Sequence, residues 1–125
     1  MESLKELSKK IYEANKEKGF WDKERSFGEI IALCHCELSE AFEEYRKKEN
    51  LPNGGMYYFS DKNGELHEKN DEKCSLKPEG MASEMIDVII RVLDWCGSEN
   101  LDVDSLISEK LAYNKTRPYK HNKNC

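Results

Sequence analysis

The first half of the chain carries two stripes of apolar residues at the spacing of an α-helix. The first stripe, in residues 3–18, repeats at three and four positions and consists of Leu4, Leu7, Ile11 and Ala14. Ser26 and Glu29 then have the spacing of a capping box, which starts a helix. The stripe that follows consists of Phe27, Ile30, Ile31, Cys34, Leu38, Ala41, Phe42 and Tyr45. We therefore predict a helix that ends at Gly19 and a longer helix that begins after Ser26.

A polar stretch at about 51–80 interrupts this pattern. It opens with the letters LPNGG, whose proline and glycines stop the second helix. The dipeptide Asn63-Gly64 near its centre favours a tight turn. The flanking segments 56–60 and 65–68 therefore either pair as a small hairpin or belong to an unstructured loop, and the sequence leaves both alternatives open.

The second half of the chain predicts two further helices. Pro78-Glu79-Gly80 introduces the third, over 81–97, and Gly97 closes it. Apolar residues cover most of its circumference, which predicts a central place in a bundle; they are Met81, Met85, Val88, Ile89, Val92, Leu93, Trp95 and Cys96. Asp102 can cap a fourth helix before Pro118, with an apolar side formed by Val103, Leu106, Ile107 and Leu111.

These patterns predict an all-α fold, a helical bundle of four main helices in a single domain, 1–125, with a polar insertion at about 51–80. Charged residues make up 36% of the 125 residues and the hydrophobic set only 38%. Because so small a chain buries a modest fraction of its surface, we expect the bundle to be completed by oligomerisation. The net charge of −5 argues against binding nucleic acid through its phosphates.

Targeting signals and cysteine content indicate the cellular compartment of a protein. No apolar run approaches the roughly 20 residues that cross a bilayer, and the charged segment MESLKELSKKIYEANK lacks the apolar core of a signal peptide. Five cysteines, with no CxxC pair, fit reduced thiols better than disulfides. We therefore expect a cytoplasmic protein with no membrane partner.

The letters CHC at 34–36 suggest zinc at first sight. On a helix, Cys34 and Cys36 lie roughly 200° apart, since each residue turns by about 100°. Three consecutive helical residues cannot close a tetrahedral zinc site. We therefore predict that Cys34 packs in the core and that His35 and Cys36 lie near the surface.

Carboxylates on two helices form a better candidate. Glu37, Glu40 and Glu44 fall within a sector of roughly 60° beside the apolar stripe. Glu84 and Asp87, three residues apart, border the apolar surface of the third helix. Charges at such places need compensation, and two facing pairs can hold Mg²⁺ or Mn²⁺ through their oxygens. The alternative is a pair of solvated helix faces.

The last helix adds positive charge. Lys110, Asn114 and Arg117 have the i, i+4, i+7 spacing of one helix face, and Lys120 follows Pro118. Basic residues at a helix C-terminus usually match the helix dipole. Beside a divalent cation they would instead clamp phosphate oxygens.

Over residues 20–50 and 77–123 the chain resembles the MazG-like, all-α nucleoside triphosphate pyrophosphohydrolases. Their signature of ExxE followed by ExxD is matched by Glu37-Leu38-Ser39-Glu40 and by Glu84-Met85-Ile86-Asp87, and the segment EKLAYNKTRPYKHNK is also similar. The resemblance implies a homodimer or homotetramer that hydrolyses (deoxy)nucleoside triphosphates to monophosphates and pyrophosphate. It further implies Mg²⁺, or Mn²⁺, at these four acidic residues.

The resemblance and the charges together suggest roles for other residues. Glu40, with Glu37, would act on the attacking water, and Trp21 would either stack on the base or cover the end of the bundle. Arg91 would contact phosphate or neutralise the carboxylates. Further substrate-binding positions are Lys110, Asn114, Arg117 and Lys120. Two alternatives stay open: a related phosphoribosyl-nucleotide or dUTP pyrophosphatase, and a non-catalytic helical oligomer that binds nucleotides or a partner.

Overall fold

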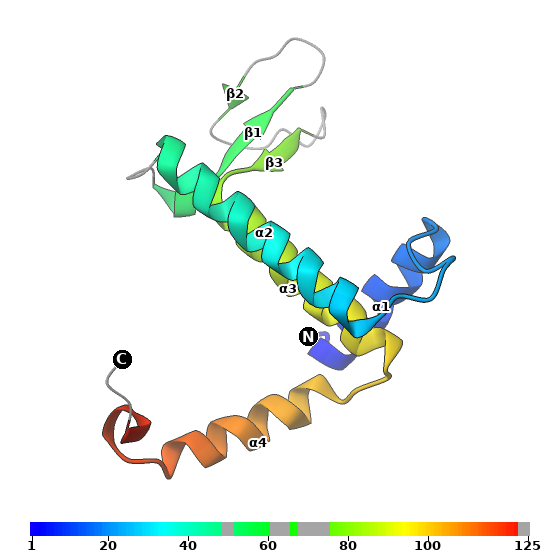
Figure 1. Cartoon of the computed structure of the whole chain (residues 1–125), viewed down its shortest axis with the longest axis vertical. Helices are drawn as coiled ribbons and strands as arrows, with labels where there is room; N and C mark the ends of the chain where they lie inside the picture. The colour runs from blue at the N-terminus through cyan, green and yellow to red at the C-terminus, as the bar shows by residue number, and fades with distance from the viewer. Residues whose placement is uncertain (49–51, 61–65, 68–75, 123–125) are drawn as a thin grey trace. The chain divides into compact units, whose positions relative to one another are not determined.

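A computed structural model describes residues 1–48, 52–60, 66–67 and 76–122 (Figure 1). The chain divides into two compact units. One comprises Met1–Asp22 and Leu93–Cys125, here called the terminal unit, and the other comprises Lys23–Val92, the central unit. The expectation of a single domain with an insertion stays a prediction.

Within the described residues the fold is mostly helical, as expected. The four predicted helices are present as α1 (Leu4–Glu17), α2 (Phe27–Lys48), α3 (Met81–Ser98) and α4 (Val103–Lys115). Two short 3₁₀ helices, η1 (Asn53–Gly55) and η2 (Tyr119–Asn122), accompany them. The all-α prediction is incomplete, because the polar insertion also holds a small sheet of β1 (Tyr57–Phe59), β2 (Leu66–His67) and β3 (Lys77–Glu79). No described helix is both long and apolar enough to cross a membrane.

Side-chain caps begin the helices where the sequence indicated. The hydroxyl of Ser26 accepts a hydrogen bond from the Glu29 amide at 3.1 Å, and Asp102 accepts one from the Ser105 amide at 3.2 Å. Each cap satisfies an amide that has no partner inside its helix. The predicted starts at Ser26 and Asp102 are therefore confirmed.

Gly97 does not close the third helix, which is a correction to the sequence analysis. α3 continues to Ser98, and the left-handed backbone comes later, at Asn100 with φ of 54°. A Cβ atom on Gly97 would lie 2.3 Å from the carbonyl oxygen of Ser8 and 2.7 Å from Cβ of Tyr12. The glycine is therefore required by the close approach of α1 to α3.

The sheet has the order β2-β1-β3, with antiparallel pairs. Tyr58 pairs with His67 and Phe59 with Leu66, so of the two alternatives for this segment the hairpin is the one observed. Its turn, with Asn63-Gly64, lies outside the described residues. β3 was not predicted, because Pro78 is rare inside strands; it is tolerated here on an edge strand.

Glycines fix the beginning of α3. Gly80 has φ of 110°, and a Cβ atom there would lie 2.1 Å from the carbonyl oxygen of Gly55. A Cβ atom on Gly54 would lie 2.7 Å from Cβ of Ala82. Since no side chain separates them, η1 packs directly on the first turn of α3, which carries Glu84.

In the central unit, α2 and α3 lie side by side (Figure 1). The buried positions of α2 recur at helical spacing and are Ile30, Cys34, Glu37 and Ala41. Cys34 is buried while His35 and Cys36 are exposed, which confirms their predicted places.

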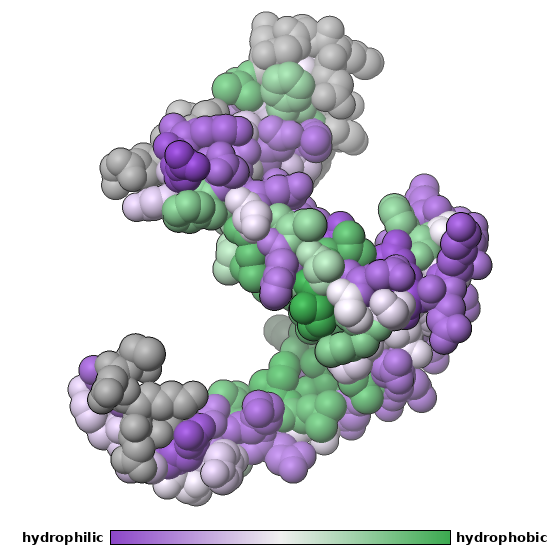
Figure 2. Space-filling model, viewed as in Figure 1, coloured by the Kyte–Doolittle hydropathy of each residue, from purple (hydrophilic) through white to green (hydrophobic). Residues whose placement is uncertain are grey.

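Much of the predicted apolar stripe is exposed in the single chain. Figure 2 shows apolar surface over parts of α2, α3 and α4. On α2 the exposed large residues are Phe27, Ile31, Leu38, Phe42 and Tyr45, and on α3 up to Val92 they are Met85, Ile86, Ile89, Ile90 and Val92. Contiguous exposed apolar surface of this kind usually marks an interaction site.

The terminal unit has its own buried core, and hydrogen bonds connect its first and last helices. Its buried cluster comprises Leu93, Cys96 and Val103, with Ile11, Trp95 and Leu101 packed against them. Asp104 on α4 accepts the backbone amides of Leu4 at 3.1 Å and Lys5 at 2.9 Å. These bonds lower the pKa of Asp104, because they favour its ionised form. A residue of the last helix thus caps the first.

Candidate metal centre

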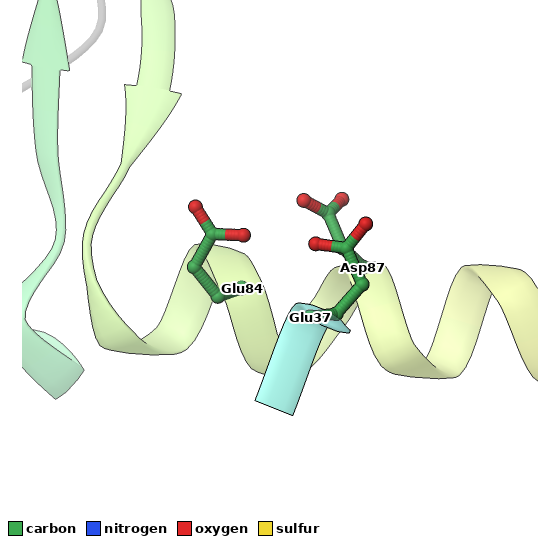
Figure 3. A group of neighbouring side chains, drawn as sticks. All are labelled: Glu37, Glu84 and Asp87. Carbon is green, nitrogen blue, oxygen red and sulfur yellow. The ribbon is translucent and has the colours of Figure 1, made fainter. Parts of the chain in front are cut away.

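Three carboxylates from two helices meet in the central unit. Figure 3 shows Glu37 on α2 and Glu84 and Asp87 on α3, with their carboxyl groups directed to the same side. Each offers an oxygen, and these oxygens all lie within 4.8 Å of one another. Glu37 is only 8% exposed, and the other two are half-buried. Clustered carboxylate oxygens are the donors that suit Mg²⁺ and Mn²⁺, so these residues could hold such an ion.

The positions of these three residues along their helices explain why their carboxylates lie close together. Glu37 follows Cys34 by three residues and precedes Ala41 by four, so it lies on the buried face of α2. Glu84 and Asp87 are neighbours on one face of α3, a turn apart. Side-by-side packing of the two helices then brings the pair against Glu37.

Glu40 lies beside this group but is exposed. Its carboxyl group interacts with those of both Glu37 and Glu84, as their pKa shifts show. All four acidic residues of the two motifs are therefore neighbours, although only three of them form the close group.

Arg91 supplies positive charge from the next turn of α3. Its Nε donates to Oε1 of Glu37 at 2.8 Å, and its Nη2 lies 2.8 Å from the same oxygen. Of the two roles considered for Arg91, the neutralising contact is present in the structure. A contact with phosphate stays a prediction.

Burial, with the neighbouring acidic groups, shifts the pKa values of the clustered carboxylates. Burial, together with hydrogen bonds to Glu40 and Glu37, raises the pKa of Glu84 from 4.5 to about 8. Burial and the charge of Glu37 also raise the pKa of Asp87. Burial alone would raise the pKa of Glu37, but hydrogen bonds from Arg91, Glu40 and Glu84 outweigh it and lower that pKa. At neutral pH and without a cation, Glu84 thus holds a proton.

This arrangement predicts a pH dependence of stability in EDTA. The folded chain keeps a proton on Glu84 up to about pH 8, whereas the unfolded chain releases it near the ordinary pKa of 4.5. The resulting stability is present below pH 4.5 and is lost as the pH rises toward 8. Asp87 acts in the same direction. We expect the melting temperature, followed by circular dichroism, to fall across this range.

The variant Glu84→Gln separates this effect from other titrations. Glutamine does not ionise in this pH range, so most of the fall in melting temperature with rising pH should disappear. A decline of equal size in wild type and variant would contradict the assignment to Glu84.

Glu44, which shares the sector of Glu37 and Glu40 on α2, has a different partner. The hydroxyl of Tyr57 on β1 donates to its two carboxylate oxygens at 3.0 and 3.2 Å. Burial, followed by the nearby carboxylates of Glu44 and Glu79, raises the pKa of Tyr57. Glu44 therefore joins α2 to the sheet, which helical spacing alone could not indicate.

Trp21 belongs to the terminal unit, where its indole N–H donates a hydrogen bond to a residue of the same unit. Nε1 lies 3.0 Å from Oδ1 and 3.2 Å from Oδ2 of Asp94, to which it donates. Nδ2 of Asn15 donates to Oδ2 at 2.9 Å, and Asp94 is only 7% exposed. The ring also makes an edge contact with Tyr12 at 5.3 Å between centroids. These contacts favour a packing role for Trp21, while stacking on a base stays a prediction.

Asp94 is not among the residues predicted from the sequence to have a role. The available signal was a carboxylate between Leu93 and Trp95 in the most apolar helix, where an ionised group needs partners. Its partners, Asn15 and Trp21, lie too far away along the chain to be inferred from spacing.

The basic positions also lie in the terminal unit. Lys110 and Asn114 are exposed on α4. Arg117 does not share their helix face, because α4 ends at Lys115 and Pro118 disfavours a helical conformation at the residue before it. The Arg117 guanidinium instead lies 5.8 Å from the Tyr113 ring centroid, and Nζ of Lys120 lies 5.8 Å from that of Tyr119. Their part in binding substrate stays a prediction.

Comparison with protein-family models, with curated proteins and with solved structures finds no match to this chain. A function for this chain therefore has to be inferred from its motifs and from the geometry of the acidic cluster.

Proposed function

We propose that the protein is a Mg²⁺-dependent nucleoside triphosphate pyrophosphohydrolase of the MazG-like kind, which converts (deoxy)nucleoside triphosphates to monophosphates and pyrophosphate. The observation that supports this most is the meeting of Glu37, Glu84 and Asp87 from two helices, with oxygens within 4.8 Å. These residues belong to the ExxE and ExxD motifs that carry the family resemblance.

Charge explains why such a site would need a cation. A triphosphate and a cluster of carboxylates repel each other. Glu37, Glu84 and Asp87, with Glu40 beside them, have the oxygen donors to hold Mg²⁺. Bound Mg²⁺ would supply positive charge for the phosphate oxygens and acidify water.

The protein's own residues would then direct the hydrolysis. Glu40 is exposed and adjoins both Glu37 and Glu84, so we assign to its carboxylate the proton of the attacking water. The water oxygen bonds to the α-phosphorus, the bond from that phosphorus to the bridging oxygen breaks, and pyrophosphate leaves. Trp21, Arg91, Lys110, Asn114, Arg117 and Lys120 keep the substrate-binding roles that the resemblance suggests, as predictions.

A substrate panel tests the reaction. Purified protein is incubated with ribo- and deoxyribonucleoside triphosphates, in Mg²⁺ and in EDTA, and pyrophosphate and orthophosphate are assayed separately. We expect pyrophosphate only with Mg²⁺. Orthophosphate as the first product would contradict cleavage between the α- and β-phosphorus. No product from any triphosphate, with the protein folded, would favour another phosphorylated substrate or a binding protein.

We also propose that a second copy of the chain covers the exposed apolar residues of α2 and α3. Phe42 is 60% exposed, Ile89 51% and Met85 48% in the single chain. Burying such side chains between subunits removes apolar surface from water. Light scattering should therefore give the mass of a dimer or tetramer, and Phe42→Glu should shift the equilibrium toward the monomer. A monomeric wild type at concentrations near 1 mM would contradict this proposal, since it would place the dissociation constant above about that value.

A further inference from the structure

Arg91 makes a direct cationic contact with the acidic cluster. Two of its nitrogens, Nε and Nη2, lie 2.8 Å from one oxygen of Glu37. The Arg91 side chain is 34% exposed, whereas that of Glu37 is 10% exposed. The carboxylate is therefore held in the packed region between two helices, and the arginine reaches it from the partly exposed side.

The contact compensates a buried charge. An ionised carboxylate removed from water is strongly unfavourable unless a cation or hydrogen-bond donors replace the lost solvation. Arg91 supplies both at once, and its charge partly offsets the rise in the pKa of Asp87 that burial and Glu37 cause. One guanidinium thus serves two of the three clustered carboxylates.

The same contact competes with a divalent cation. The lone pair of Oε1 of Glu37 that accepts the hydrogen bond from Nε of Arg91 cannot also be directed at a metal ion. A guanidinium only a few ångströms away also repels a doubly charged ion, because the repulsion falls slowly over such distances in a partly buried place. Arg91 and a metal ion therefore compete for Oε1 of Glu37.

We propose that Arg91 is a built-in counter-cation, which pairs with Glu37 and holds the two helices together without metal, and which a divalent ion displaces from Glu37 on binding. This inference rests on the proposed metal site and adds a role that the motifs do not assign. Arg91 stabilises the metal-free protein and weakens its affinity for the ion. In this role it is a positioning residue, because it acts through Glu37.

The variant Arg91→Met tests the inference, since methionine keeps an unbranched apolar stem without the charge. The matched control is Arg46→Met. Arg46 pairs with Glu43 at 3.1 Å on the exposed side of α2, where the two side chains are 63% and 55% exposed. An exposed pair of this kind contributes little to stability. Binding of Mn²⁺ alone is measured by calorimetry and by the electron paramagnetic resonance signal of free Mn²⁺.

We expect Arg91→Met to bind Mn²⁺ about tenfold more tightly than wild type, and Arg46→Met to bind it like wild type. In EDTA, Arg91→Met should melt several degrees below wild type, and saturating Mn²⁺ should close most of that gap because the ion replaces the missing charge. Arg91→Lys keeps a positive charge and should stay within a few-fold of the wild-type affinity.

Each other outcome either supports the inference or overturns a named part of it. Equal or weaker Mn²⁺ binding by Arg91→Met, with binding by wild type intact, overturns the role of Arg91 and leaves the metal site standing. Failure of wild type to bind Mn²⁺ overturns the metal site and this inference with it. If Arg91→Met folds only with Mn²⁺, the inference is supported. If it folds under neither condition, the ion does not replace the guanidinium and the inference is wrong.

Discussion

Replacing Asp87 with asparagine is expected to lower the Mg²⁺-dependent release of pyrophosphate at least about a hundredfold, the effect of losing one electrostatic group from an active site. Asparagine keeps the shape of the side chain but removes the charge of one of the three carboxylates whose oxygens lie within 4.8 Å. The ratio kcat/KM is measured with the preferred triphosphate from the substrate panel. Circular dichroism verifies that the helices are retained.

Glu43→Gln is the matched control for this result. Glu43 is an exposed residue of α2 that pairs with Arg46, and it belongs to neither acidic motif. Its loss should leave kcat/KM within about twofold, since exposed ion pairs contribute little. If the folded Asp87→Asn variant turned over triphosphate as fast as Glu43→Gln, Asp87 would have no part in catalysis.

Replacing Asp94 with alanine is expected to lower the free energy of unfolding by about 3 kcal/mol, the range for removing a buried charged acceptor. Asp94 is buried and accepts hydrogen bonds from Trp21 and Asn15. Alanine removes the acceptor of both donors inside the terminal unit. Urea unfolding followed by circular dichroism measures the change, and tryptophan fluorescence reports the altered surroundings of Trp21.

Two further variants serve as comparisons for Asp94→Ala. Asp94→Asn keeps one acceptor oxygen and should cause a smaller loss than alanine. Glu99→Ala, at an exposed position just after α3, should change the free energy of unfolding by no more than about 0.5 kcal/mol. If Asp94→Ala were as stable as Glu99→Ala, the hydrogen bonds to Asp94 would not contribute to stability.

The features that the sequence predicted well are those that local chemistry determines. Ser26 and Asp102 begin helices because their side chains reach amides three residues later. Helical periodicity likewise placed Glu84 beside Asp87 and put Cys34 in the core. Each of these inferences needs only the neighbours within one turn.

The features that the sequence did not reveal depend on residues far apart in the chain. Gly97 looked like a helix end, but its lack of a side chain serves contact with Ser8 and Tyr12 of α1. β3 exists because β1 is there to pair with it, despite Pro78. The partners of Asp94 and Glu44 were hidden for the same reason, since no local pattern connects them.

Asp104 has a consequence for the order of folding. It caps the amides of Leu4 and Lys5, about a hundred positions earlier, so these residues receive this cap only after Asp104 has been synthesised. The central unit, Lys23–Val92, is continuous and emerges from the ribosome before α4 does. Contacts between distant parts of a chain form slowly, because they close large loops. We therefore expect the central unit to acquire structure first during translation, and α1 to gain its lasting protection from proteases last.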